Sequence, residues 1–201
     1  NDQQWARVAS ADDGSFVVTW TSNQAASQDV YFRRFAADGT ALTGELLATN
    51  TTSGVQKNSV IAMDSATGEF VIAWQGEGPG DGDGIFFRRF NADATPNGID
   101  NLANLTDRGV EHDPVIAMQT GGEFVIGWDA GQHIYFQRFN SLGGSQGSEV
   151  QIDGGLSTSS GLAVASDSSG NFTFVYREEA ILTGIWSRGY NADGSVRYGH
   201  F

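Results

Sequence analysis

The sequence predicts an all-β protein, a four-bladed β-propeller of four-stranded antiparallel sheets in which the last blade is incomplete. Three observations favour this fold class. A unit of roughly 50 residues repeats four times. Its strand-like pieces are apolar on both faces, and short polar turns that contain glycine separate them. A solenoid of stacked sheets and a β-sandwich assembled from paired units are the alternatives.

The repeat is clearest in one aromatic segment of each unit. Its copies are FVVTW at 16–20, FVIAW at 70–74, FVIGW at 124–128 and FTFVY at 172–176. A short apolar piece and a polar turn precede each copy, which is typical of a β-hairpin. Alternate residues of a strand point to opposite faces, and both sets are apolar in these segments. We therefore expect sheets covered on both faces, with four equivalent buried phenylalanines: Phe16, Phe70, Phe124 and Phe172.

A second aromatic segment follows in each unit and predicts the third strand. Its copies are VYFRRF at 30–35, IFFRRF at 85–90, IYFQRF at 134–139 and IWSRGY at 185–190. After a further turn, a step from glycine to an acidic residue starts a fourth strand in the first three units. In the last unit this strand would start only at His200, so we expect 185–190 to be an open edge. The four repeats cover approximately 1–54, 55–108, 109–158 and 159–201 of a single domain.

Composition excludes several classes of function. Asp and Glu number 24 against 11 Lys and Arg, and the formal net charge is −13. Such a charge argues against binding to nucleic acid or to an anionic membrane surface. The chain has no cysteine, which excludes disulfides and thiolate metal sites. No apolar run is long enough for direct membrane insertion.

The combination of FVV-x-W, VY-x-x-RF and ADG resembles a repeat of large secreted, RTX-associated bacterial proteins. The resemblance covers nearly the whole chain, in all four units. It implies an extracellular or cell-surface location and dependence on calcium. The RTX nonapeptide G-G-x-G-x-D is absent, so the resemblance assigns no calcium ligands. The turn at Ser10, Asp12 and Gly14 also resembles part of the Asp-box of sialidase-type propellers, which is a structural element.

The segment GEGPGDGDG at 76–84 is the candidate metal site. Glu77, Asp81 and Asp83 offer carboxylate oxygens on a glycine-rich backbone that can wrap an ion. Calcium prefers six to eight oxygen ligands, so calcium is the cofactor that this segment predicts. The alternative is an acidic loop without an ion.

Three residues are the candidate ligand-binding set. Trp5 and Trp186 lie outside the series of tryptophans that recurs with the repeat, and we expect them to be exposed. Arg188 occupies a repeated arginine position that Arg33 and Arg88 share, and arginines can bind an anionic sugar or a sulfate. The alternative for the arginines is a structural contact that the repeat duplicates.

Histidines and paired carboxylates supply the remaining candidates for chemistry. His112, His133 and His200 lie in different parts of the repeat, and we expect exposed loop positions for them. Glu178 and Glu179 follow the aromatic segment of the last unit, where a solvated loop is the expectation. A carboxylate pair is also what glycoside hydrolysis requires.

The sequence therefore favours a non-catalytic, extracellular binding or scaffold module with a role such as adhesion, whose partner is a protein or a glycan. Two alternatives remain open. One is a structural subunit that self-associates or joins a larger complex at its open blade edge. The other is a carbohydrate-active enzyme with carboxylates at a channel mouth.

Overall fold

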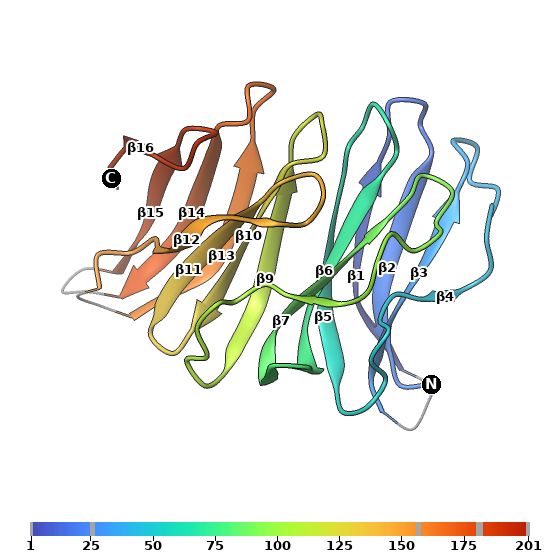
Figure 1. The fold of residues 1–201 in the computed structure, drawn as a ribbon, viewed down its shortest axis with the longest axis horizontal. Coiled ribbons are helices and arrows are strands. Elements are labelled where there is room, and N and C mark those ends of the chain that lie inside the picture. The colour runs from blue at the N-terminus through green and yellow to red at the C-terminus, as the bar shows by residue number, and fades with distance from the viewer. Residues whose placement is uncertain (1, 25–26, 156–157, 180–182, 200–201) are drawn as a thin grey trace. The chain divides into compact units, whose positions relative to one another are not determined.

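The computed structural model describes residues 2–24, 27–155, 158–179 and 183–199, and the chain is all-β as predicted (Figure 1). The strands form four antiparallel four-stranded sheets, each from strands consecutive in the sequence. The chain divides into two compact units, Asn1–Ala103 and Asn104–Phe201, each with two sheets. The prediction that 1–201 is a single domain stays a prediction.

Unit 1 contains the sheets of the first two repeats. Sheet 1 consists of β1 (Gln3–Ser10), β2 (Phe16–Ser22), β3 (Asp29–Phe35) and β4 (Leu46–Leu47). Sheet 2 consists of β5 (Gln56–Met63), β6 (Phe70–Gly78), β7 (Asp81–Phe90) and β8 (Asn101–Leu102). The valine- and aromatic-rich segments form the two central strands of each sheet, as their composition predicts.

Unit 2 contains the sheets of the last two repeats. Sheet 3 consists of β9 (Glu111–Met118), β10 (Phe124–Ala130), β11 (His133–Phe139) and β12 (Ser145–Gln151). Sheet 4 consists of β13 (Thr158–Ser166), β14 (Phe172–Glu179), β15 (Thr183–Tyr190) and β16 (Val196–Tyr198).

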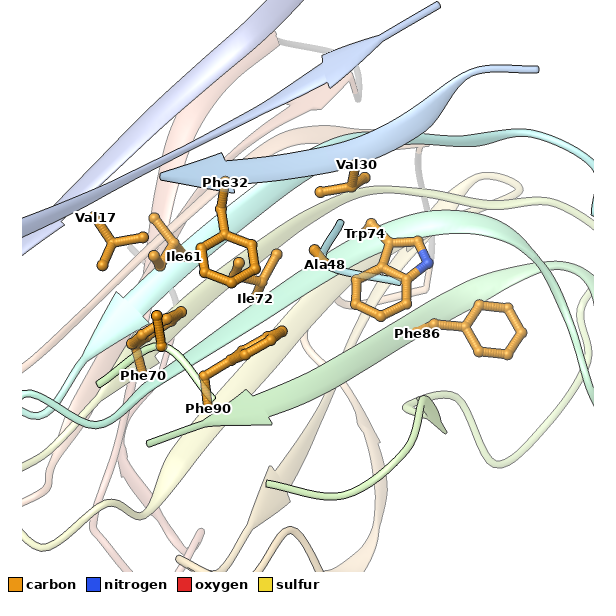
Figure 2. Packing of buried hydrophobic residues seen from close by; sticks show 11 residues of the cluster. Val17, Val30, Phe32, Ala48, Ile61, Phe70, Ile72, Trp74, Phe86 and Phe90 are labelled. Carbon is orange, nitrogen blue, oxygen red and sulfur yellow. The ribbon is translucent and has the colours of Figure 1, made fainter. Parts of the chain in front are cut away.

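Within each unit, the core lies between the two sheets. In unit 1, Phe32 of sheet 1 packs on the stacked rings of Phe70 and Phe90 of sheet 2, beside Trp74 (Figure 2). In unit 2, Phe136 of sheet 3 packs in the same way on the stacked pair of sheet 4, Phe172 and Tyr190. The repeat therefore duplicates one mode of sheet packing.

The expectation that every sheet is covered on both faces is only partly right. All residues of β10 are buried, as are Phe70–Gly76 of β6. In contrast, β14 alternates between buried and more exposed residues, and Val175 is 38% exposed. Phe70, Phe124 and Phe172 are buried as predicted, whereas Phe16 is only half-buried. Among the described residues, the second strands of sheets 1 and 4 are therefore less buried than those of sheets 2 and 3.

The last sheet has the fourth strand that the sequence placed only from His200 onward. Strand β16 pairs with Gly189 and Tyr190, at the end of β15. In sheets 1 and 2 the outer strand pairs with the middle of the third strand, at Tyr31 and at Phe86 respectively. The open edge expected over 185–190 is thus covered at its end by β16, and His200 and Phe201 lie outside the described residues.

Candidate active site

The first strand of every sheet contains a bulge at the same position of the repeat. Its register shifts just after the strand begins. The equivalent residue has a positive φ in each copy: Trp5 (54°), Asn58 (53°), Asp113 (51°) and Gly161 (67°). A positive φ is unfavourable for residues other than glycine, and bulges of this kind redirect side chains and occur next to active sites. The bulge is therefore a structural constant of the repeat.

The residues at the bulge vary although the bulge itself is constant. The three residues that end at it are QQW in sheet 1, QKN in sheet 2, EHD in sheet 3 and SSG in sheet 4. Only sheet 3 has titratable groups at all three positions: Glu111, His112 and Asp113. A functional site depends on particular side chains held by a fold that many proteins share, and the bulge of sheet 3 offers such side chains.

A buried carboxylate, Asp129, lies beside these residues in unit 2. Asp129 directly follows the aromatic segment of β10 and pairs with His112 of β9. Its side chain is buried, and burial raises the pKa of the Asp129 carboxyl to about 6. Two weaker effects lower the Asp129 pKa: the electrostatic interaction with His112 and a hydrogen bond from the Gly161 backbone. The nearby charge of Asp113 raises this pKa further. The Oδ1 atom of Asp129 has no hydrogen-bond partner in the described part of the chain.

His112, Asp113 and Asp129 form one cluster, which we call the bulge site. One ligand atom from each side chain lies within 4.8 Å of the other two. The His112 Nδ1 atom is 2.9 Å from Asp113 Oδ2. His112 and Asp113 are accessible, whereas Asp129 is buried. One imidazole and two carboxylates can hold a divalent metal ion, and two unequal carboxylates can also perform acid–base chemistry.

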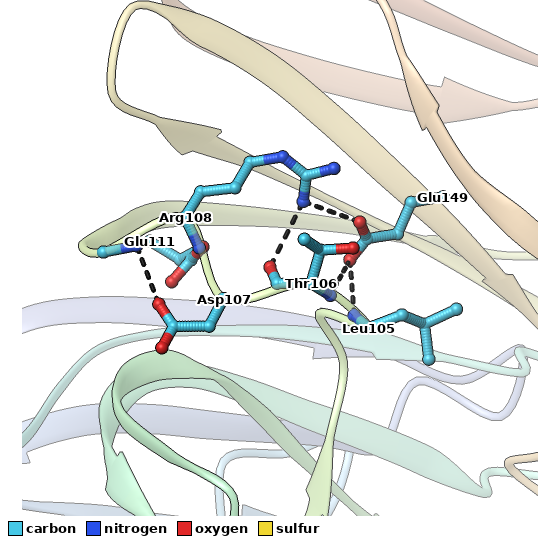
Figure 3. Close-up of polar contacts among 7 residues, drawn as sticks. Leu105, Thr106, Asp107, Arg108, Glu111 and Glu149 are labelled. Atoms are coloured by element: carbon cyan, nitrogen blue, oxygen red, sulfur yellow. Dashed lines mark hydrogen bonds and ion pairs between the residues drawn. The ribbon is translucent and has the colours of Figure 1, made fainter.

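A structured loop holds the start of β9 in place (Figure 3). The buried carboxylate of Glu111 accepts a 2.7 Å hydrogen bond from the Arg108 backbone. Asp107 Oδ1 accepts a 2.8 Å bond from the Gly109 backbone. Glu149 of β12 accepts hydrogen bonds from the backbone N–H groups of Leu105 and Thr106.

The side chain of Arg108 completes this arrangement. It donates to Glu149 Oε2 at 2.6 Å, and its guanidinium carbon lies 3.9 Å from the centroid of the Tyr135 ring. Glu149 is largely buried, so this ion pair is shielded from solvent. The loop therefore fixes Glu111, and with it the adjacent His112 and Asp113, on rigid elements.

The expectation of exposed loop histidines is wrong for the two described ones. His112 belongs to β9, and His133 begins β11. The His133 Nδ1 atom is 3.0 Å from Asp153 Oδ2, and the Asp153 side chain is fully buried. Glu178 is also not in a solvated loop, because β14 extends through it and its side chain is buried. The exposed Glu179 bonds to Arg177.

The predicted calcium ligands lie on a β-hairpin in unit 1, between β6 and β7, whose register shifts between Gly76 and Gly78. Gly78 pairs with Asp81 across a two-residue turn. Asp81 Oδ1 accepts a 3.0 Å bond from the Asp83 backbone. Glu77 and Asp83 line a pocket of about 230 Å³ together with Lys57, whose positive charge opposes binding of a cation. In the described residues, Glu77, Asp81 and Asp83 are not a set with ligand atoms within 4.8 Å. Calcium binding here stays a prediction.

The three predicted ligand-binding residues are divided between the two units. Trp5 is 41% exposed, on the bulge of β1 in unit 1. Trp186 and Arg188 lie on β15 in unit 2, and Trp186 is half-buried. The Arg188 guanidinium donates a 2.7 Å bond to the Ile152 carbonyl and lies over the Tyr190 ring. This contact is the structural alternative for the arginine series, and ligand binding by Arg188 stays a prediction.

Sequence reasoning missed the bulge site, although the signal was in the repeats. Asp129 directly follows FVIGW, where the other copies have Thr21, Gln75 and Arg177. An aligned comparison of this position and of the EHD segment would have identified sheet 3 as the chemically distinct copy. The strand pairing between Asp129 and His112, and the burial of Asp129, only became visible in the structure.

No protein-family model matches the chain, and no curated protein matches it. Solved structures do. An α-L-arabinofuranosidase from Lactobacillus brevis matches with a TM-score of 0.62 at 10% identity, over 98% of this chain and 75% of that one. An α-L-arabinofuranosidase from Fusarium graminearum matches with a TM-score of 0.62 at 9% identity, over 94% and 58%. A putative glycoside hydrolase from Parabacteroides distasonis matches with a TM-score of 0.58 at 11% identity, over 100% and 72%.

These matches support the predicted propeller fold class and correct the predicted function. The expectation of a non-catalytic binding or scaffold module, and thus of no enzyme, is contradicted, because the similar structures are described as glycoside hydrolases. The carbohydrate-active enzyme, an alternative in the sequence analysis, agrees better with them. Extracellular location and adhesion stay untested predictions. In the described ranges, no helix is long and apolar enough to cross a membrane.

Proposed function

We propose that the chain is a glycoside hydrolase whose reaction takes place at the bulge site. The observation that carries this proposal is the pair of unequal carboxylates. Asp129 is buried with a pKa of about 6, and Asp113 is an exposed carboxylate nearby. Glycosidases use two such groups, one protonated as the general acid and one ionised.

The catalytic roles of Asp129 and Asp113 follow from the burial of the first and the exposure of the second. Asp129 stays protonated at mildly acidic pH and donates its proton to the oxygen of the leaving sugar. Asp113 is an exposed carboxylate that faces solvent, so it can attack the anomeric carbon. Oxygens of the two groups lie within 4.8 Å of each other, closer to the roughly 5–5.5 Å of retaining enzymes than to the 6.5–9.5 Å of inverting ones. We therefore propose a retaining mechanism.

The substrate class in this proposal comes from the comparisons. The similar structures include two described as α-L-arabinofuranosidases. A third is described as belonging to a group of mannoside phosphorylases that contains hydrolases of β-1,2-mannosidic linkages. Furanosides and mannosides are accordingly the first substrates to test.

The test is hydrolysis of nitrophenyl arabinofuranoside and mannoside, followed by β-1,2-linked manno-oligosaccharides. We expect Asp129→Asn to reduce the rate roughly 10²–10⁴-fold, the range for a general acid. Gln75→Asn is the matched control, because Gln75 occupies the same repeat position in sheet 2 and should leave the rate unchanged. Activity should decline as pH rises above about 6, because Asp129 then loses its proton.

Two outcomes would reject this proposal. One is full activity in Asp129→Asn, and the other is no hydrolysis of any furanoside or mannoside in the panel. A chelator distinguishes acid–base catalysis at the bulge site from metal-dependent catalysis. Activity that a chelator abolishes and Mn²⁺ or Zn²⁺ restores would show that His112, Asp113 and Asp129 act as metal ligands instead.

A further inference from the structure

One face of sheet 1 carries three kinds of group that other sheets use to bind the preceding sheet or the linker that follows it. We define this docking face by Phe16, Phe35, Arg33 and Glu45. Each of these four residues has an equivalent in another sheet. The contacts of the equivalent residues within units 1 and 2 show what the docking face can bind.

The first element is a stacked aromatic pair that receives a phenylalanine. In unit 1 the stacked Phe70 and Phe90 receive Phe32, and in unit 2 Phe172 and Tyr190 receive Phe136. In sheet 1 the equivalent rings are Phe16 and Phe35, which stack with centroids 5.0 Å apart. Both are only half-buried. The receiving pair is therefore preformed, but no ring from the described ranges packs into it as in the other two cases.

The second element is an arginine that bonds to the outer segment of the preceding sheet. Arg88 donates to the Ala48 carbonyl at 3.3 Å, and Arg188 donates to the equivalent Ile152 carbonyl at 2.7 Å. Each also lies over the aromatic ring two residues further along the strand. Arg33 keeps this ring contact, with Phe35, and its Nε bonds within sheet 1 to the Thr43 carbonyl. Its terminal nitrogens remain available for a carbonyl of another sheet.

The third element is an acid that accepts hydrogen bonds from the linker of the preceding sheet. Asp100 accepts from the backbones of Asn50 and Thr51, and Glu149 accepts from the equivalent Leu105 and Thr106. Glu45 is the equivalent acid in sheet 1, where it is exposed. Within the described residues, no hydrogen bond or ion pair involves Glu45.

The exposure of β1 agrees with an unoccupied docking face. In its equivalent in sheet 2, β5, all eight residues are buried or half-buried, whereas seven of the eight residues of β1 are exposed. Val8 is 63% exposed, while its counterpart Ile61 is 9% exposed. Exposed apolar residues on one face, rimmed by charged groups, mark an interaction surface.

We propose that this docking face binds a further four-stranded sheet of the same repeat. The partner must present three groups: a phenylalanine at the position of Phe32, an outer-strand carbonyl for Arg33, and two consecutive linker amides for Glu45. This inference is independent of the glycosidase proposal, because it uses no residue of the bulge site.

A second copy of this chain is a poorer partner. It would offer the exposed face of its sheet 4, which carries the 69% exposed Ile185. At the position of Phe32 and Phe136, however, this sheet has Ser187. The stacked pair would then receive a hydroxyl in place of an aromatic ring and would lose the packing that the other sheets share.

The experiment supplies such a sheet by fusion to the chain. A copy of residues 55–109, whose sheet carries Phe87 at the required position, is fused ahead of Asp2. We expect the amides of β1 and β4 to exchange at least tenfold more slowly in the fusion than in the original chain. Phe87→Ser in the copy, or Arg33→Ala with Glu45→Gln in the original sheet, should abolish this protection. Glu179→Gln, which alters an exposed acid of sheet 4, is the control that should retain it.

Two results would overturn the proposal. In one, the amides of β1 exchange as fast in the fusion as in the original chain, whether or not the fused sheet itself is protected from exchange. In the other, sedimentation of the original chain at micromolar concentration shows self-association that Val8→Lys abolishes, which would identify a second copy as the occupant. A monomeric original chain together with protected β1 in the fusion is the result that we expect.

Discussion

Sheets 2 and 3 have nearly the same central strands but differ in their chemistry. Both have an almost fully buried second strand, FVIAW in one and FVIGW in the other, and both have the bulge. At the bulge, however, sheet 2 has Lys57 and Asn58 where sheet 3 has His112 and Asp113. The difference indicates that the buried core residues are kept between the two copies, whereas the side chains at the bulge differ. Each sheet can therefore serve as the control for the other.

The largest expected effect concerns what the two sheets share. Trp74 is 1% exposed and Trp128 is 0% exposed. Truncation of either to alanine should therefore cost about 3–5 kcal/mol of unfolding free energy, as for other large aromatic residues in cores. Urea unfolding measures both. A loss below about 1 kcal/mol for one of them would show that the two cores are not equivalent.

The next effect should occur only in sheet 3. The pKa of Asp129 is raised from 3.8 to about 6 in the folded protein, so the native state binds the proton more tightly than the unfolded state. Stability should then fall by about 2–3 kcal/mol as pH rises from about 4 to about 6, and Asp129→Asn should remove this loss. Unfolding across this pH range tests the prediction, with Gln75→Asn as the variant that should keep the wild-type pH profile.

A smaller effect distinguishes the two tryptophans by their hydrogen bonds. Trp74 Nε1 donates to buried Gln56 Oε1 at 3.0 Å, whereas Trp128 Nε1 has no partner in the described part of the chain. Replacement by phenylalanine leaves a similar void in both sheets but orphans an acceptor only in sheet 2. We expect Trp74→Phe to cost about 1–3 kcal/mol more than Trp128→Phe. Equal losses would indicate that Trp128 also has a partner, such as a bound water.

The smallest effect concerns the bulge. Asn58 and Asp113 both have a positive φ, which glycine tolerates and which costs other residues roughly 1–2 kcal/mol. Glycine removes this cost but loses roughly 0.5–1 kcal/mol more backbone entropy on folding, so the net change in stability should be below about 1 kcal/mol in either sheet. Under the proposed mechanism, Asp113→Gly should nevertheless abolish hydrolysis while Asn58→Gly preserves it. Loss of hydrolysis in both variants would show that catalysis depends on the bulge backbone and not on the Asp113 carboxylate.

The sequence by itself determined the strands and their grouping into four sheets. Its copies of the aromatic segments predicted β2, β6, β10 and β14, because apolar alternation over five to seven residues is a local property of a strand. The same copies predicted equivalent positions for Phe70, Phe124 and Phe172, all of which are buried.

Only the tertiary structure decided which copies are covered and which carboxylates meet. Phe16 and Phe70 begin similar segments, FVVTW and FVIAW, yet the exposure of each depends on whether another sheet packs on it. Asp113 and Asp129 are separated along the chain and become neighbours through the pairing of β9 with β10. Burial then raises the pKa of Asp129, which no local pattern encodes, because desolvation depends on atoms from all the strands around the carboxyl.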